Sequence, residues 1–167
     1  DLQSKVNEGT YFSVSVPLKI DRDVSGEKSD STVRPTVDMH RKMALLVEDN
    51  ELNMEIAEFL LEGEGMIVVK ASNGKEAVEK FAASEVGGFD IIFMDVMMPV
   101  MNGLDAARKI RSMTRADAQT IPVIAMTANA FQDDVQRSFE VGMNAHITKP
   151  LDINKIREAI TDVMTKK

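Results

Sequence analysis

Several residues with useful chemistry stand directly after short apolar runs of the chain. In chain order they are Glu48 and Asp49, Asp95, Thr127 and Lys149. If the three carboxylates converge they repel one another, so a proton or a cation has to lie between them. Ligation by oxygen alone, in a chain without cysteine, favours Mg²⁺, with Mn²⁺ as a substitute.

The same residues suit phosphoryl transfer, which depends on positioning and charge neutralisation more than on covalent help. Asp95 would be the nucleophile and would form an acyl phosphate. Lys149 would pair with one phosphoryl oxygen, and the Thr127 hydroxyl would donate a hydrogen bond to another. Each residue alone has a plainer interpretation, since a carboxylate after a strand is usually a helix cap. Their occurrence together favours a phosphoryl-acceptor site.

Apolar strands and amphipathic helices alternate along the segments that carry these residues. The predicted strands cover residues 43–47, 66–69, 91–94, 122–126 and 145–148. A predicted helix follows each strand: residues 51–61, then helices around Ala77–Phe81 and Leu104–Ile110, then 132–140 and 153–163. This order predicts an α/β fold with a five-stranded parallel, doubly wound sheet. In such a sheet the site lies beyond the carboxyl ends of the strands, where the polar residues fall.

The first 42 residues have a different character. The alternation in Tyr11–Val16 predicts one half-buried strand, and residues 21–38 have the composition of a linker. A lone strand and a linker cannot bury enough apolar area to fold independently. We therefore expect an N-terminal extended tail before a globular domain that starts near residue 43.

Composition excludes some classes of protein. Residues 1–42 hold seven acids and seven Lys/Arg, so the rest holds 27 − 7 = 20 acids and 20 − 7 = 13 bases and carries the whole net charge of −7. An acidic domain is repelled by nucleic-acid phosphates, and we expect no direct nucleic-acid binding. No apolar run approaches the roughly 20 residues that a membrane span needs. The chain begins without Met or a signal peptide, and we expect it to be part of a longer protein.

Four motifs occur in a specific order and spacing. They are Leu46–Asn50 with Asn53, Asp95–Gly103 (D-V-M-M-P-V-M-N-G), Met126–Ala128 and Thr148–Pro150. Together they make residues 43–165 resemble a response-regulator receiver domain, the phosphoacceptor module of two-component signalling. The resemblance implies a flavodoxin-like (βα)5 fold with Asp95 as the phosphorylation site.

The resemblance also implies a metal site. Asp49, Asp95 and the backbone carbonyl of Met97 would bind Mg²⁺, and Glu48 would assist, through water.

A switch and a special peptide bond are implied as well. Thr127 and residue 146 would form the conformational switch, and Lys149-Pro150 would be a cis peptide. His146 departs from the Phe or Tyr that is usual at its position, so the usual readout of the switch is in question here. The plainer interpretation is that His146 lies exposed on a partner-binding face.

The motifs E-D-N-E-L-N and M-T-A-N-A resemble receivers of hybrid sensor histidine kinases in particular. Gly9–Leu18 is similar to the last glycine box and strand of the kinase ATP-binding domain. We predict a remnant of that domain over residues 1–20, a linker over 21–42 and a receiver over 43–167. Without an Asn box or a His box, the chain itself would only accept a phosphoryl group and dephosphorylate itself.

The partners that this resemblance implies are a histidine kinase dimerisation domain and a His-phosphotransfer protein. The implied location is the cytoplasm, with a parent kinase anchored in the inner membrane as one possibility.

Other functions stay open at this point. One is a stand-alone, phosphorylation-switched binding module, and another is a degenerate receiver that only docks. An aspartyl-nucleophile phosphatase needs a second Asp two residues after the nucleophile, where this chain has Met97. A nucleotide- or flavin-binding relative of flavodoxin needs a Gly-rich phosphate loop after the first strand, where this chain has Glu48-Asp49.

Overall fold

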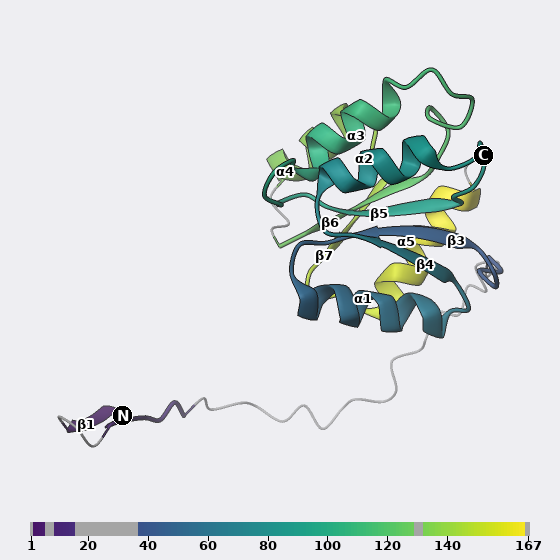
Figure 1. The fold of residues 1–167 in the computed structure, drawn as a ribbon. Helices are drawn as coiled ribbons and strands as arrows, with labels where there is room; N and C mark the ends of the chain where they lie inside the picture. The colour runs from purple at the N-terminus through teal and green to yellow at the C-terminus, as the bar shows by residue number, and fades with distance from the viewer. Residues whose placement is uncertain (1, 6–8, 16–36, 129–131, 166–167) are drawn as a thin grey trace. The chain divides into compact units, whose positions relative to one another are not determined.

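The computed structural model describes residues 2–5, 9–15, 37–128 and 132–165. The chain divides into two compact units, with the boundary between Arg34 and Pro35. The second unit alternates strands and helices (Figure 1): β3 (Met43–Val47), α1 (Glu51–Gly63), β4 (Ile67–Ala71), α2 (Gly74–Ala83), β5 (Ile91–Asp95), α3 (Gly103–Arg111), β6 (Val123–Thr127), α4 (Gln132–Glu140), β7 (Ala145–Thr148) and α5 (Ile153–Thr165).

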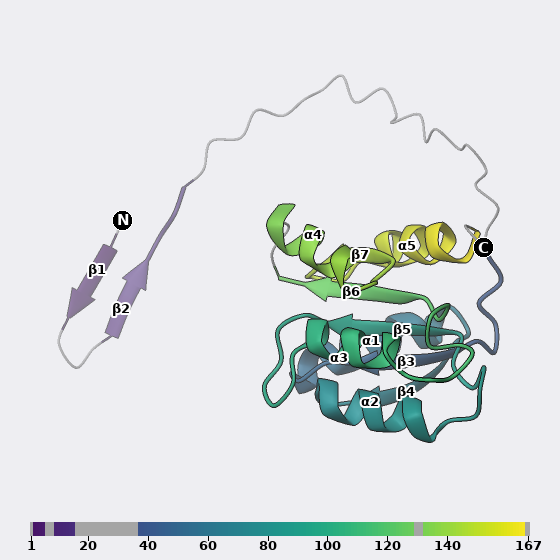
Figure 2. The same ribbon diagram turned by 90° about the horizontal axis from the view of Figure 1, so that it is seen from above.

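The five strands of this unit form one sheet in the order β4-β3-β5-β6-β7, and every neighbouring pair is parallel (Figure 2). The predicted five-stranded parallel, doubly wound sheet is confirmed. The bounds differ most at β4, which begins at Ile67 and extends to Ala71, whereas the sequence predicted residues 66–69. After β3 the chain forms β4 on one side of β3, and then returns to form β5 on the other side. The carboxyl ends of β3 and β5 therefore lie next to each other at the point where the strand order reverses, inside the sheet.

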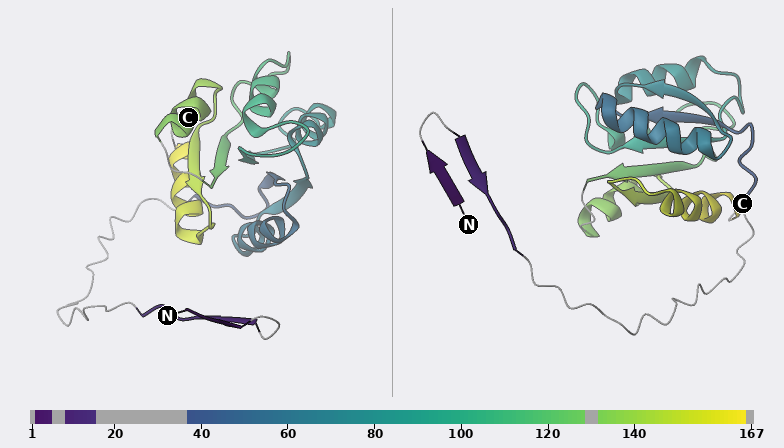
Figure 3. Two further views of the ribbon diagram at one scale, coloured as in Figure 1. Left: turned by 90° about the vertical axis from the view of Figure 1, so that its left-hand side faces the viewer. Right: turned by 90° about the horizontal axis from the view of Figure 1, so that it is seen from below.

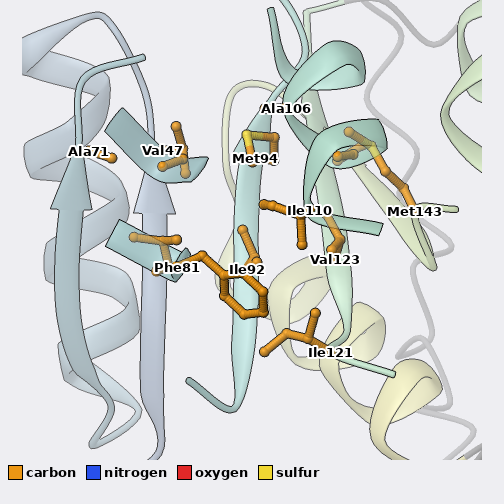
Figure 4. Close-up of a cluster of buried hydrophobic side chains, with 14 of the residues drawn as sticks. Val47, Ala71, Phe81, Ile92, Met94, Ala106, Ile110, Ile121, Val123 and Met143 are labelled. Atoms are coloured by element: carbon orange, nitrogen blue, oxygen red, sulfur yellow. The ribbon is translucent and has the colours of Figure 1, made fainter. Parts of the chain in front are cut away.

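Helices cover both faces of the sheet (Figures 1 and 3), and apolar side chains of the central strands alternate between these two helical layers. In β3, Leu45 and Val47 pack toward α2 and α3, whereas Ala44 and Leu46 pack toward α1 and α5. Figure 4 shows the first of these clusters, in which Phe81 of α2 and Ile110 of α3 cover the sheet. Burial on both faces explains why the strands are continuously apolar.

Asparagine side chains start three of the helices. Asn50, Asn73 and Asn102 each accept a hydrogen bond from the backbone N–H three residues later, at the first turns of α1, α2 and α3. This capping fixes where each loop stops and each helix begins. Since each loop leaves the carboxyl end of a strand, the caps also hold the loops that surround the site.

The segment before β3 belongs to the core of this unit. Met39 is 6% exposed and packs in the cluster beneath α1 and α5. The backbone N–H of Arg41 donates to the carbonyl of Gly65, 2.8 Å away. Packing therefore begins before residue 43, where the sequence analysis placed the start of the domain. A single buried methionine in a polar segment produces no periodic pattern, so the sequence did not reveal this earlier start.

The described residues of the first unit, 2–5 and 9–15, include one pair of antiparallel strands. Its strands β1 (Leu2–Lys5) and β2 (Gly9–Phe12) pair antiparallel, with Leu2 opposite Phe12 and Lys5 opposite Gly9 (Figure 2). The prediction of one unpaired strand over Tyr11–Val16 is wrong, because β2 has a partner and ends at Phe12, while residue 16 lies outside the described residues. The sequence missed β1 because its four residues are too few and too polar to show alternation.

Candidate functional site

The residues singled out by the sequence lie along one edge of the sheet, at the carboxyl ends of four adjacent strands. Glu48 and Asp49 follow β3, Asp95 ends β5, Thr127 ends β6 and Lys149 follows β7. Carboxylate oxygens of Glu48, Asp49 and Asp95 all lie within 4.8 Å of one another. Residues that are up to 101 positions apart in sequence thus meet at one place, as the arrangement of strand ends predicts.

Asp95 is the buried centre of this group. It is 4% exposed, and its Oδ1 accepts a hydrogen bond of 3.1 Å from the backbone N–H of Met97. Its Oδ2 accepts one of 2.7 Å from Lys149 Nζ. Burial raises the pKa of Asp95 and the charge of Glu48 adds to this rise, while the contacts with Lys149 and Met97 offset only part of it.

Lys149 is the cation of the group. Its Nζ lies 2.5 Å from Glu48 Oε2 and 2.7 Å from Asp95 Oδ2, so one ammonium bridges two buried carboxylates. Burial alone lowers the pKa of Lys149, but hydrogen bonds and charge attraction from both carboxylates outweigh it, and the pKa is raised. The backbone N–H of Lys149 donates to the carbonyl of Thr127 at 2.8 Å, and the Lys149-Pro150 peptide bond is cis.

Glu48 depends on a residue to which the sequence gave no role. Asn53, in the first turn of α1, donates from Nδ2 to Glu48 Oε1 over 2.9 Å. With Lys149 on its other oxygen, Glu48 has both oxygens satisfied at 2% exposure. The signal was present as the E-D-N-x-x-N spacing, because Asn50 caps α1 and thereby turns Asn53 toward the strand end.

Two glycines allow the loops to close around the site. A Cβ at Gly103 would overlap the backbone carbonyl oxygen of Asp95. A Cβ at Gly74 would lie 2.6 Å from the carbonyl oxygen of Met101. The motif that ends in Gly103 therefore needs glycine because α3 begins directly against the strand that carries Asp95.

Thr127 and His146 occupy different surroundings. Thr127 is 6% exposed at the end of β6, beside the strand of Asp95. His146 is exposed on β7, and its ring meets the edge of Phe139 with 6.1 Å between centroids and an interplanar angle of 88°. It lines a cavity of about 430 Å³ between α4, β7 and α5, outside the carboxylate group.

The acidic group is built from oxygen ligands suited to a hard divalent cation. Octahedral Mg²⁺ holds oxygens at about 2.0–2.1 Å, so its ligands lie about 3–4 Å from one another. Carboxylate oxygens within 4.8 Å therefore fit with small side-chain movements. Asp49, which is exposed, leaves one side of the group open to water and to a ligand.

Comparison with known proteins identifies the chain. A family model for the response regulator receiver domain matches residues 44–161. The chain belongs to the response regulator receiver domain family. As a receiver domain it is a module of two-component signal transduction.

Its relatives include histidine kinases. The receiver is 37% identical over 141 residues to probable histidine kinase 2 of Oryza sativa, with 78% of this chain and 13% of the rice protein covered. It is 32% identical over 163 residues to the peroxide stress-activated histidine kinase mak2 of Schizosaccharomyces pombe, with 94% of this chain and 7% of that protein covered. The chain thus spans a small fraction of the length of these relatives.

A solved structure agrees with the fold. The receiver domain of a sensor histidine kinase from Pseudomonas aeruginosa is 32% identical and has a TM-score of 0.66, with 74% of this chain and 98% of that chain covered. That crystal structure has a magnesium ion coordinated in its active site cleft. Within the described part of the present chain, no helix has both the length and the apolar character required to cross a membrane.

Proposed function

We propose that this receiver domain takes a phosphoryl group from a phosphohistidine onto Asp95 and passes it to a His-phosphotransfer protein, within a hybrid sensor histidine kinase. The observation that carries the proposal is the convergence of Asp95, Glu48, Asp49 and Lys149 at one edge of the sheet. Buried carboxylates that share one ammonium group contribute little to the stability of a fold, and such groups are typical of functional sites.

The chemistry follows from the positions of the side chains. An oxygen of Asp95 attacks phosphorus, the P–N bond to the donor imidazole breaks, and the leaving imidazole takes up a proton. Lys149 and the hydroxyl of Thr127 neutralise and orient the phosphoryl oxygens. Phosphorylated Asp95 then gives the group to the histidine of the next protein by the reverse step.

Mg²⁺, with Mn²⁺ as a substitute, is the cofactor that the ligand set supports. Asp49, Asp95 and the carbonyl of Met97 would hold it, with Glu48 assisting, and the ion would supply charge neutralisation at the phosphoryl group. Lys149 now compensates two carboxylates, which is a task that a divalent cation can take over. Lys149 would then be released to pair with the incoming phosphoryl group.

The upstream part of the proposal concerns residues 1–42. A match over 94% of 167 residues, about 157, cannot begin later than about residue 11, so the similarity to mak2 extends ahead of the receiver into β2. We infer that residues 1–20 end the ATP-binding domain of a parent kinase and that 21–42 lead from it to the receiver. A hairpin needs a larger sheet or a packing partner to be stable, which the missing part of such a domain would supply.

Incubation of the chain with acetyl phosphate and Mg²⁺ tests the acceptor role. Wild type should gain one phosphoryl group, measured as intact mass, and Asp95→Asn should gain none. Asp117→Asn, a matched change at an acid outside the site, should be labelled like wild type. Equal labelling of Asp95→Asn and wild type contradicts the assignment. Chelation of the metal should suppress labelling, whereas labelling at an unchanged rate contradicts the cofactor.

A further inference from the structure

The two acids that follow β3 differ in their freedom to move. Asp49 is exposed, whereas Glu48 is 2% exposed. The backbone N–H of Glu48 donates to the carbonyl of Ala71 at 3.1 Å, which extends the pairing of β3 with β4 by one residue and fixes the start of the Glu48 side chain. Because water has little access to the Glu48 carboxylate, protein groups have to satisfy its oxygens.

The two oxygens of Glu48 have different donors. Oε2 lies 2.5 Å from Lys149 Nζ, and Oε1 accepts a hydrogen bond of 2.9 Å from Asn53 Nδ2. In the proposed reaction Lys149 turns to the phosphoryl group, so Oε2 becomes available to a cation. The amide of Asn53 carries no charge and has no comparable reason to leave. Oε1 therefore stays occupied when Oε2 is released.

The start of α1 holds Asn53 in place. The backbone N–H of Asn53 donates to Asn50 Oδ1 at 3.1 Å, and the backbone N–H of Met54 donates to the carbonyl of Asn50 at 2.9 Å. These bonds fix the backbone of the first turn, from which the short side chain of Asn53 reaches Glu48. A carboxylate can only accept hydrogen bonds, so the amide nitrogen of Asn53 has to face it.

Divalent cations differ in how many carboxylate oxygens they take. Mg²⁺ binds six oxygens at about 2.0–2.1 Å and keeps several waters, whereas Ca²⁺ takes about 6–8 oxygens at about 2.3–2.6 Å and often uses both oxygens of one carboxylate. A carboxylate with one oxygen already hydrogen-bonded to an amide offers at most one oxygen. Such a carboxylate suits the cation that needs fewer protein ligands.

We propose that Asn53 is a specificity-determining residue of the cation site. By occupying Oε1, it prevents Glu48 from binding a cation through both oxygens, and it thereby favours Mg²⁺ over Ca²⁺. The proposal rests on the proposed function, in which Mg²⁺ is the cofactor, and adds the reason for which this cation is selected. Asn53 acts through Glu48 and is a positioning residue.

A plainer role for Asn53 makes a different prediction. Loss of its amide leaves a buried oxygen of Glu48 without a donor, which lowers stability whether or not a cation binds. A residue that only stabilised this corner of the fold would affect the binding of both cations to the same extent. The ratio of the dissociation constants for Ca²⁺ and Mg²⁺, here called the Mg²⁺ preference, therefore separates the two roles.

The test measures the binding of each cation to the metal-free chain without a phosphoryl donor. Urea unfolding over a series of Mg²⁺ or Ca²⁺ concentrations gives each dissociation constant, because a cation that binds only the folded state raises the free energy of unfolding. Asn53→Leu should lower the Mg²⁺ preference about tenfold. Asn53→Ala should act alike and serves if the leucine variant does not fold. Asn154→Leu, a matched change at an exposed position in the first turn of α5, should leave the preference unchanged.

A second substitution tests whether Asn53 acts through Glu48. The side chain in Glu48→Gln cannot offer two carboxylate oxygens, so Asn53→Leu in that background should change the Mg²⁺ preference less than about twofold. A fall as large as that in the wild-type background overturns the proposal, as does an unchanged preference in Asn53→Leu and Asn53→Ala. A wild type that binds Ca²⁺ and Mg²⁺ equally also overturns it, and the proposed function survives. A wild type that binds neither cation removes the cofactor from the proposed function and the role of Asn53 with it.

Discussion

Two ion pairs in this receiver have the same chemistry and opposite electrostatics. At the site, Asp95 faces Lys149, and burial raises the pKa of Asp95. In the loop after α3, Asp117 faces Arg115 at 2.6 Å, and hydrogen bonds from that guanidinium lower the pKa of Asp117 to about 2. The difference arises chiefly because burial dominates at Asp95, with the charge of Glu48 adding to it, whereas the hydrogen bond from Arg115 dominates at Asp117.

The second pair shows what an ion pair built for structure looks like. Arg115 also donates to the carbonyls of Phe81, Ser84 and Glu85, and its guanidinium lies 4.2 Å from the centroid of the Phe81 ring. Every group is satisfied, and the loop is fixed to α2. In the site pair, one ammonium is divided between two carboxylates, so a cation that binds these carboxylates can take the place of Lys149.

The largest expected effect distinguishes the role of Lys149 in the chemistry from the role of Arg115 in stability. Lys149→Met should slow phosphorylation of Asp95 by acetyl phosphate on the order of 100-fold, because a donor to the phosphoryl oxygens is lost. Arg115→Met should phosphorylate like wild type while its free energy of unfolding falls by about 2–3 kcal/mol. Labelling rates and urea unfolding measure the two quantities. If both ion pairs served only to stabilise the fold, Lys149→Met and Arg115→Met would both lose stability, and both would be phosphorylated at the wild-type rate.

Met39 is a buried residue outside the phosphoacceptor site, so its replacement should affect stability and not phosphorylation. Met39→Ala should lower the free energy of unfolding by about 2–3 kcal/mol, since it empties a position that is 6% exposed. Removal of residues 1–36 should leave the melting temperature nearly unchanged, whereas removal of 1–40 should lower it. Phosphorylation at 25 °C should persist in all three. Equal melting temperatures for the two truncations would place Met39 outside the core.

Matched Asp→Asn changes at the two pairs should alter stability in opposite directions. The pKa of Asp95 is raised, so its ionisation opposes folding; this penalty is absent below about pH 4 and grows as the pH rises above the ordinary pKa of an aspartate. Asp95→Asn should therefore stabilise the metal-free protein at pH 7. The lowered pKa of Asp117 stabilises the fold above about pH 4, and that contribution disappears as the pH falls to about 2.

Asp117→Asn should accordingly lose about 1–2 kcal/mol at pH 7 and little at pH 2. Urea unfolding at both pH values, with metal chelated, gives the comparison. The same sign of change in both variants at pH 7 would remove the distinction between the two pairs.

The smallest effect is expected at His146. We expect His146→Tyr to increase the change in partner affinity caused by a phosphoryl mimic such as beryllofluoride, by less than about tenfold. A larger aromatic ring gains more apolar burial when it turns inward from its edge contact with Phe139. Titration of the His-phosphotransfer partner with and without the mimic measures this change. An identical change in both proteins makes His146 an ordinary exposed residue.

The sequence by itself determined the sheet and the position of the site. Apolar strands at regular intervals specify a buried parallel sheet, and strand ends in such a sheet meet at one edge, so Asp95, Asp49 and Lys149 could be brought together from their positions alone. The caps at Asn50, Asn73 and Asn102 are also local signals, since each acts within three residues.

Only the tertiary structure decided which side chains pair. That Lys149 bridges Glu48 and Asp95 and that Arg115 fastens the end of α2 depend on contacts across 31 to 101 residues, which no periodicity encodes. Met39 likewise enters the core only through packing against residues of other elements. The pairing of β1 with β2 could not be predicted for another reason. A short polar strand has no alternating pattern of its own and is defined by its hydrogen bonds to the partner strand. Secondary structure follows from local pattern, whereas the charge state of a buried group is set by every neighbour that packing brings to it.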